Sequence, residues 1–209
     1  MSRTARKPVS APRLTAQGQA TKNRIVRAAA DLMAERGAAR TTVEDVLETA
    51  GVSASQLYHY FGDKGGLVRA VVAFQAEAAF ERQQPFLDHL DSFDALKAWR
   101  DQRVSLQIEN GCAGGCELGA LASELVESSP EARAYLAAAF TRWQEPIRSG
   151  LHRMRERGEM RAEADPDRLS AALLAALQGG VLLTQIHRDP EHLAAALDAV
   201  LDHIRSFAA

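Results

Sequence analysis

Cysteine and aromatic residues are scarce in this chain of 209 residues, which has two Cys and 6% aromatic residues. Two thiols cannot form a disulfide scaffold, nor can they supply the four thiolates of a structural zinc site. Apolar runs are also short: stretches such as residues 171–177 fall far below the roughly 20 residues of a membrane span. No apolar segment with a small-residue cleavage site follows the basic N-terminus, so we expect no membrane helix, no secretory signal and a cytoplasmic protein.

The residue patterns of catalysis and metal binding are missing too. The six histidines are scattered along the chain, and none forms an HExxH or similar metal-binding pair. No strand pattern precedes a glycine-rich phosphate loop, and the pairs Gly114-Gly115 and Gly179-Gly180 are isolated. We therefore expect no catalytic residues, no metal site and no cofactor.

Acidic residues are absent before Asp31, whereas that segment holds seven Lys and Arg. Residues 1–64 contain ten basic and six acidic residues and carry a net charge of +4, and residues 65–209 carry −6. A basic N-terminal part on an acidic remainder favours binding to a polyanion. Residues 1–19 show no periodicity and predict a flexible basic arm, which either meets that polyanion or only keeps the chain soluble.

Apolar residues recur every three or four positions from about residue 20 almost to the C-terminus, and no alternating strand pattern competes. Residues that begin or end helices accompany this periodicity, such as Gly37, Asp63 and the Asp-Pro pairs at 165–166 and 189–190. The chain is therefore expected to be all-α. The expected helices start near residues 20, 41, 53, 63, 94, 117, 130, 165 and 189.

Two short helices close together form the most informative pattern. Thr41 with Glu44, and Ser53 with Gln56, have the three-residue spacing of a capping box, and only the turn at residues 50–52 separates the two helices. A supporting helix, a tight turn and a short second helix are typical of a helix-turn-helix DNA reader. Compact helical hairpins of other function have a similar local pattern.

The second of these short helices has one side that can pack and another that can reach DNA. Leu57 and Phe61 supply apolar contacts to the supporting helix. Polar and aromatic side chains on the remaining surface can contact bases in a groove roughly 12 Å wide. They are Ser55, Gln56, Tyr58, His59 and Tyr60.

The string LYHYFGDK at residues 57–64 resembles the recognition-helix signature of the Tet repressor (TetR) family of transcription regulators almost residue for residue. This resemblance extends over about residues 20–72, and residues 111–125 resemble the LmrA/YxaF-like branch of the family. It implies an all-helical dimer. Each subunit would have a three-helix DNA-binding domain at residues 20–66 and a six-helix ligand-binding and dimerisation domain at residues 67–209. Ligand binding would change the separation of the two DNA-binding domains.

Several residues near the expected DNA-binding surface have two alternative roles. Thr41 and Thr42 either bind a phosphate oxygen or only cap a helix, and Lys64 either binds phosphate or is an ordinary surface lysine. Gln56 either completes its capping box or reaches an adenine edge, and we favour the base slightly. Tyr60 is either a DNA contact or structural. The expected DNA-binding residues are Thr41, Thr42, Ser53, Ser55, Gln56, Tyr58, His59, Tyr60 and Lys64.

The larger domain is expected to bind a small-molecule effector between its fifth to eighth helices, with Arg103 as the clearest partner for an anionic ligand. Its aromatic residues either line this pocket or form ordinary core. Cys112 and Cys116 either form an oxidation-sensitive pair or act as small apolar side chains, and the helix start at Cys116 favours a lowered thiol pKa. The candidate ligand-binding residues are Trp99, Arg103, Cys112, Cys116, Phe140, Trp143, Gln178 and Gln185.

Apolar stripes on the last two helices predict a four-helix contact about a two-fold axis. The expected interface residues are Leu173, Leu177, Val181, Leu197 and Leu201. The sequence thus predicts a dimeric DNA-binding regulator, in the form of a repressor that a small molecule releases from a palindromic operator. Two alternatives stay open: a helical small-molecule binding protein without sequence-specific DNA binding, and a thiol-based redox sensor.

Overall fold

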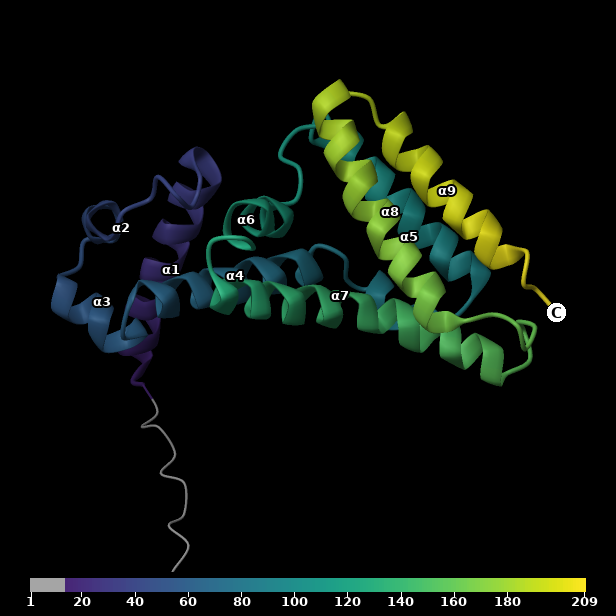
Figure 1. Ribbon diagram of the computed structural model, residues 1–209, viewed down its shortest axis with the longest axis horizontal. Coiled ribbons are helices and arrows are strands. Elements are labelled where there is room, and N and C mark those ends of the chain that lie inside the picture. Colours follow the sequence, from purple (N-terminus) through teal and green to yellow (C-terminus); the bar gives the residue numbers. More distant parts are fainter. Residues whose placement is uncertain (1–13) are drawn as a thin grey trace, which may run out of the picture.

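The computed structural model describes residues 14–209, and its regular structure is helical (Figure 1). The helices are α1 (Ala16–Arg36), α2 (Val43–Ala50), α3 (Ala54–Phe61), α4 (Lys64–Glu81), α5 (Phe93–Glu109), α6 (Glu117–Leu125), α7 (Pro130–Glu156), α8 (Pro166–His187) and α9 (Glu191–Arg205), with a short 3₁₀ helix, η1 (Phe86–His89), before α5. Within the described residues, strand-type pairing is limited to one isolated bridge between Met160 and Ala208. The expected all-α class is confirmed.

α1 begins earlier than the sequence predicts. Thr15 is its N-cap, and the Thr15 hydroxyl accepts a hydrogen bond from the Gly18 amide at 3.1 Å. Residues 16–19, which we expected in the flexible arm, therefore form the first helical turn. The apolar periodicity does not reveal this turn, because the side chains of the turn are small or polar and mostly exposed. The remainder of the expected arm, residues 1–13, lies outside the described residues.

We call residues 14–66 the head and residues 67–209 the body. In the head, α2 and α3 are joined by a turn in which Gly51 is left-handed, with φ 61° and ψ 48°. Glycine adopts this conformation without the steric penalty of a Cβ. Arg24 fixes the turn to α1 because its Nε donates to the Ala50 carbonyl at 2.8 Å.

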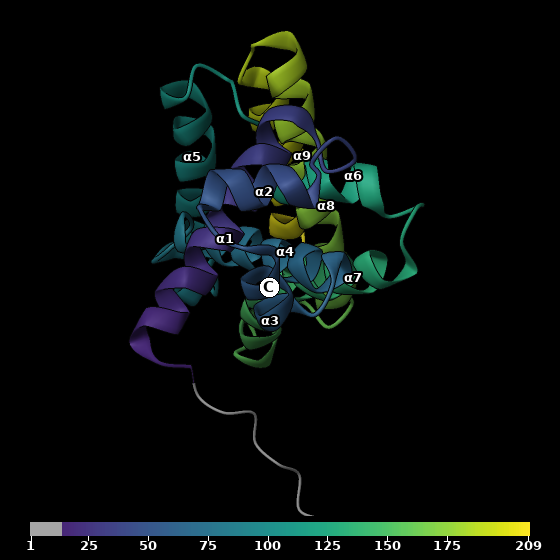
Figure 2. The ribbon, with the colours of Figure 1, turned by 90° about the vertical axis from the view of Figure 1, so that its left-hand side faces the viewer.

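α4 leads from the head into the body. In Figure 1, α1–α3 lie at one end of the molecule, and α4 runs beside α7 towards α5, α8 and α9 at the other end. The side chain of Asp63 caps α4 by accepting from the Gly66 amide at 2.7 Å, as the sequence predicts. Gly66 allows α4 to pass close to α3, since a Cβ there would lie 1.9 Å from the Phe61 carbonyl oxygen. Seen from the head, α5 and α6 lie on opposite sides of the molecule (Figure 2).

α8 and α9 pack closely against each other. An added Cβ at Gly180 would lie 2.8 Å from Cδ1 and 2.9 Å from Cα of Leu193, so a small residue is needed at this contact. α8 is also long and apolar enough, by length and composition alone, to cross a membrane, which the argument from short apolar runs missed. Of the most apolar 18-residue stretch of α8, 44% is buried inside the protein, so one side of the helix packs in the core.

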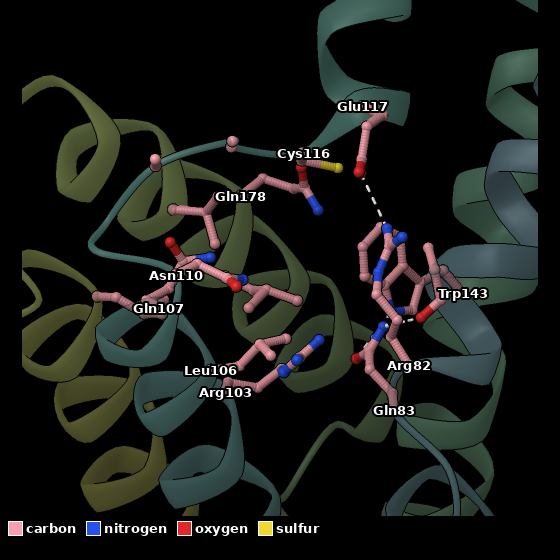
Figure 3. Close-up of a pocket in the computed structure, with 17 residues that line it drawn as sticks. Arg82, Gln83, Arg103, Leu106, Gln107, Asn110, Cys116, Glu117, Trp143 and Gln178 are labelled. Atoms are coloured by element: carbon pink, nitrogen blue, oxygen red, sulfur yellow. Dashed lines mark hydrogen bonds and ion pairs between the residues drawn. The ribbon is translucent and has the colours of Figure 1, made fainter. Parts of the chain in front are cut away.

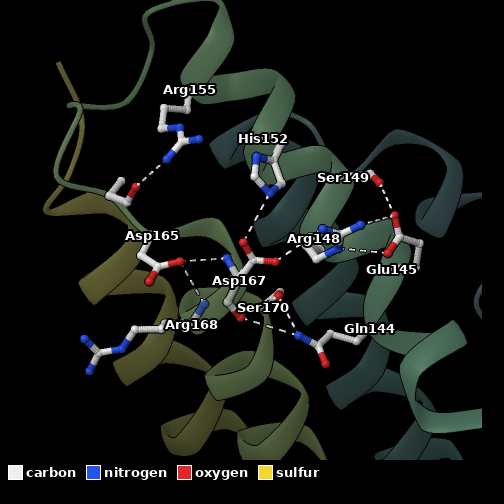
Figure 4. A network of polar contacts seen from close by, with 11 residues as sticks. Gln144, Glu145, Arg148, Ser149, His152, Arg155, Asp165, Asp167, Arg168 and Ser170 are labelled. Atoms are coloured by element: carbon white, nitrogen blue, oxygen red, sulfur yellow. Dashed lines mark hydrogen bonds and ion pairs between the residues drawn. The ribbon is translucent and has the colours of Figure 1, made fainter. Parts of the chain in front are cut away.

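A polar network fastens α7 to the start of α8 (Figure 4). Asp165 caps α8 by accepting from the amides of Asp167 and Arg168 at 3.1 and 3.2 Å. The Asp167 carboxylate pairs with Arg148 at 3.3 Å and lies 3.6 Å from Nε2 of His152. These exposed pairs contribute little each, and together they link α7 to the first turn of α8.

Candidate functional site

One face of α3 is exposed at the surface of the head. Leu57 and Phe61 are buried, whereas Ser55, Gln56, Tyr58 and His59 are exposed, Tyr58 to 48%. The helix is thus anchored on one side and open on the other, which is what a helix needs to enter the major groove. Four of the expected DNA-binding residues share this open face.

The N-terminus of α3 has a complete capping box. The Ser53 hydroxyl accepts from the Gln56 amide at 3.3 Å, and Oε1 of Gln56 accepts from the Ser53 amide at 3.0 Å. The side-chain carbonyl of Gln56 therefore accepts a hydrogen bond within the cap, and the side-chain NH₂ group is the part that can contact a base. A bidentate contact to adenine needs both ends, so it would have to break the cap.

Thr41 is not available to a phosphate. Its side chain is 1% exposed, and its hydroxyl donates to the Gly37 carbonyl at 2.9 Å. The residue that caps α2 is Thr42, one position later than predicted, and its box partner is Asp45 rather than Glu44. Hydrogen bonds from Thr42 keep the pKa of Asp45 below its usual value.

Lys64 and Tyr60 lie at the edge of this surface. Lys64 is the exposed first residue of α4, and its Nζ donates to the Thr41 carbonyl at 3.4 Å, which links the starts of α2 and α4. A lysine at a helix N-terminus adds to the positive potential there and suits a phosphate oxygen. Tyr60 is half-buried and packs edge-on against Phe61 at 6.3 Å between ring centroids, in line with a structural role.

A cavity of about 140 Å³ lies in the body between α4, α5, α6, α7 and α8 (Figure 3). Leu106, Trp143, Leu177 and Val181 provide apolar walls. The main polar lining residues are Arg82, Arg103, Gln107, Cys116, Glu117 and Gln178. The cavity thus combines apolar walls with a few polar groups, which is the usual composition of a small-molecule site.

Arg103 extends from α5 towards the opposite wall, where Arg82 and Gln83 lie (Figure 3). It is 9% exposed, and its Nε and Nη2 have no hydrogen-bond partner among residues 14–209. Burial and the nearby charge of Arg82 lower the pKa of Arg103 to about 10, so the guanidinium stays charged at neutral pH. Arg82 is itself paired with Glu117 at 2.9 Å.

Three of the other expected ligand-binding residues, Trp143, Gln178 and Cys116, also line the cavity. The Cys116 sulfur caps α6 by accepting from the Gly119 amide at 3.3 Å. Burial raises the pKa of this thiol, which corrects the expectation that the helix start would lower it. The cost of burying a thiolate exceeds the favourable effect of the helix amides.

The remaining four expected residues lie outside the cavity lining. Trp99 is fully buried, and its Nε1 donates to Oε1 of Gln83 at 3.1 Å. Phe140 stacks on Trp143, and Gln185 lies against the loop at Gly115. Cys112 is buried, and its carbonyl accepts from Arg188 at 2.9 Å. These residues support the cavity as core or loop contacts.

Gln83 is a pocket residue that sequence reasoning missed. Its Oε1 accepts from Nε1 of both Trp99 and Trp143, at 3.1 and 3.3 Å, and its Nε2 donates to the Ala79 carbonyl at 2.8 Å. It therefore satisfies both indoles and links Trp143, which lines the cavity, to the fully buried Trp99. No local signal marks it, because it follows the end of α4 beside another glutamine.

α6 connects the cavity to the head. Its first residue, Glu117, pairs with Arg82 at the cavity, and Glu124, near its other end, accepts from the Ala39 amide at 3.1 Å. Ala39 lies in the loop between α1 and α2. α6 therefore contacts both the cavity and a loop of the head.

Most of the expected dimer-interface residues are buried within the subunit. Leu173, Leu177, Val181 and Leu197 are at most 8% exposed, and Leu201 is half-buried. The four buried side chains belong to the apolar core of the subunit. The large exposed apolar residues of α8 are Leu182, Leu183 and Ile186, exposed to 55%, 43% and 61%.

Fold and site together define an all-helical protein with a DNA-reading helix-turn-helix in its head and a ligand-sized cavity in its body. Residues 25–71 match the family described as bacterial regulatory proteins, tetR family, and residues 92–200 match the tetracyclin repressor-like C-terminal domain. The chain belongs to the TetR family, and it is a DNA-binding transcriptional regulator. No group of three His, Cys, Asp or Glu in the described part of the chain is arranged to hold a metal ion.

Known members of the family are similar over most of their length. Transcriptional regulator AcuR of Cereibacter sphaeroides is 26% identical over 81% of this chain and 78% of its own. Transcriptional repressor DhaR of a Mycobacterium species is 26% identical, over 85% of this chain and 89% of its own. The crystal structure of a TetR transcriptional regulator from Chloroflexus aurantiacus is 28% identical, covers 93% of this chain and 98% of its own, and has a TM-score of 0.76.

Proposed function

We propose that this regulator is a homodimeric repressor that leaves a palindromic operator when a small molecule fills the cavity of the body. The observation that carries this proposal is the Arg82–Glu117 ion pair at 2.9 Å in the cavity wall. It joins the C-terminal end of α4, a helix that begins in the head, to α6, which contacts the head through Glu124. A ligand that displaces either helix therefore moves the head relative to the body.

Dimerisation through the outer side of α8 would place two heads on one operator. Leu182, Leu183 and Ile186 form an exposed apolar patch, which is costly to leave in water and typical of an interface. Gly179 stands beside them with open space around it, so a partner helix can approach closely. Two copies of α3 would then read half-sites about 34–36 Å apart.

For the DNA contacts we propose the exposed face of α3 and the adjacent helix starts. Ser55, Gln56, Tyr58 and His59 would face the groove, while Thr42, Ser53 and Lys64 would meet phosphates. Within the family, we assign the C-terminal half to the LmrA/YxaF-like branch on residues 111–125. We assign the protein to the cytoplasm, where a chromosomal operator is accessible.

The redox alternative has less support. Its reactive species is a thiolate, and burial raises the pKa of Cys116, which keeps the thiol neutral at physiological pH. Cys112 is buried as well. A small-molecule effector uses the cavity as it stands and requires no reaction of either sulfur.

Selection of genomic fragments bound by the full-length protein tests this function. We expect enrichment of fragments that share a palindrome, and fluorescence anisotropy should show binding to that duplex in preference to a scrambled competitor. Addition of an effector should then release the duplex. Equal binding to the palindrome and to its scrambled version would contradict the proposal.

A further inference from the structure

We propose that the ligand of the body cavity is a small organic acid whose carboxylate is bound by Arg103. This inference rests on the proposed function only in taking the cavity as the effector site. The observation behind it is a charged side chain that the fold buries without a protein partner.

The two unpartnered atoms of Arg103 define the ligand's geometry. Nε and Nη2 lie on the same edge of the planar guanidinium, and both are buried without a hydrogen-bond partner in the described residues. That edge offers two parallel N–H donors, which match the two oxygens of a carboxylate. The ligand carboxylate would thus accept from both donors and form a bidentate ion pair with Arg103.

The charges around the cavity favour an anion. The ionised residues of its lining are Arg82, Arg103 and Glu117, and Glu117 already pairs with Arg82. Arg103 is therefore left without a counterion. A buried charge without a partner is destabilising, and a bound carboxylate removes that penalty. At neutral pH the guanidinium is charged, since its pKa is about 10, and a carboxylic acid of pKa about 4 is ionised.

The size and walls of the cavity limit the rest of the ligand. A volume of about 140 Å³ is close to the roughly 150 Å³ of an engineered cavity that binds benzene. Leu106, Trp143 and Leu177 form apolar walls, while Oε1 of Gln107 and Nε2 of Gln178 are buried and lack partners in the residues described. These features fit a monocarboxylate with a short aliphatic or aromatic body and room for one further polar group.

Matched acids and amides test this class. Butyrate and benzoate are titrated into the full-length protein by calorimetry and thermal melting, beside butyramide and benzamide, with sodium chloride at equal ionic strength as the ion control. We expect at least one acid to bind at least about tenfold more tightly than its amide, because the ionised acid forms charge-assisted hydrogen bonds with the guanidinium and the amide is neutral. The idea fails if no acid binds, or if each amide binds as tightly as its acid.

Two variants locate the effect at Arg103. Arg103→Met should weaken acid binding at least about 30-fold, and Arg103→Lys should retain part of it, since lysine keeps the charge but loses the bidentate edge. Arg100→Met on the same helix is the control, because Arg100 pairs with Asp198 rather than facing the cavity. Unchanged acid binding by Arg103→Met would overturn the proposal. If Arg103→Met does not fold, the contrast between acid and amide in the wild type and the Arg103→Lys affinity decide the matter.

Operator binding separates this inference from the proposed function. An acid that binds through Arg103 without releasing the palindromic duplex would support the ligand class and contradict effector control. Release of the duplex by a neutral compound that binds equally well to Arg103→Met would support effector control and contradict the ligand class.

Discussion

The head and the body use their helices in opposite ways. In the head, α3 turns its polar side chains outward, where Tyr58 is 48% exposed, whereas in the body α5 turns Arg103 inward to 9% exposure. DNA is too large to be enclosed, so the side chains that contact it stay hydrated in the free protein. Their presence therefore costs the free protein little folding free energy. A small molecule can be enclosed, and the groups that recognise it are desolvated in advance. The residues that recognise DNA therefore leave the folding stability of the head nearly unchanged, whereas the residues that recognise a ligand lower the folding stability of the body.

The two regions meet along α4, against which α1 packs, and at α6. Their buried apolar residues form one continuous core, and the Glu124 carboxylate of α6 adds a polar contact by accepting from the Ala39 amide at 3.1 Å. Because the Glu124–Ala39 contact is polar and exposed, it can exchange partners at low cost, whereas the apolar core between α1 and α4 cannot. DNA binding by the head and ligand binding by the body should therefore be separable by substitution, and substitutions at the contact between them should change only their coupling.

Loss of the dimer should have the largest effect. Leu182→Glu combined with Ile186→Glu places charges on the exposed patch of α8, and we expect monomers with operator affinity at least about 100-fold lower, since the second half-site no longer adds avidity. Light scattering and anisotropy measure the two effects. Ala98→Glu on the exposed side of α5 is the control. A double variant that remains dimeric and binds the operator would place the interface elsewhere.

Substitutions in the head should change DNA binding without affecting the body. Lys64→Ala should weaken binding to all sequences and reduce the salt slope by about one charge. Gln56→Ala should relax sequence preference by about 1–3 kcal/mol and also lose its cap, whereas Gln56→Glu keeps the cap acceptor and loses the amide donor. Anisotropy on operator variants and thermal melting separate these losses. Wild-type discrimination by both Gln56 variants would exclude a base contact.

Substitution at the junction should weaken only communication between the regions. Glu124→Ala removes the acceptor of the Ala39 amide, so we expect unchanged effector and operator affinities when each is measured alone. The coupling between them should fall by about 0.5–2 kcal/mol. Ser123→Ala is the neighbouring control, because the Ser123 hydroxyl donates within its own helix. Full coupling in Glu124→Ala would exclude this contact from the transmission.

Oxidation should have the smallest effect. Burial keeps the pKa of Cys116 above its ordinary value, so the reactive thiolate forms only at higher pH, and alkylation at pH 7.5 should be slower than for a free thiol. Mild peroxide should leave wild-type protein and the Cys112→Ser/Cys116→Ser variant equally bound to the operator. Release of the wild type alone would restore the redox hypothesis.

Features that depend on interactions over a few residues could be predicted from the amino-acid sequence. Helix caps at Ser53 and Asp63 and the glycine turn at Gly51 depend on neighbours three or four positions away, and the structure contains each of them. The recognition string at residues 57–64 was sufficient for the family. Arg103 was also detectable, since a lone charge in an apolar helical stripe has to face either a partner or a ligand.

Which side of each apolar helix faces inward depends on packing between helices and could not be predicted from local patterns. α8 carries apolar residues almost all round, so its periodicity offers no contrast between Leu177, 2% exposed in the core, and Ile186, 61% exposed. The role of Gln83 depends on two tryptophans, one 16 and the other 60 residues away. The burial of Thr41 depends on the packing of the loop before α2. Long-range packing fixes these features, because their free energy comes from contacts that local sequence patterns do not contain.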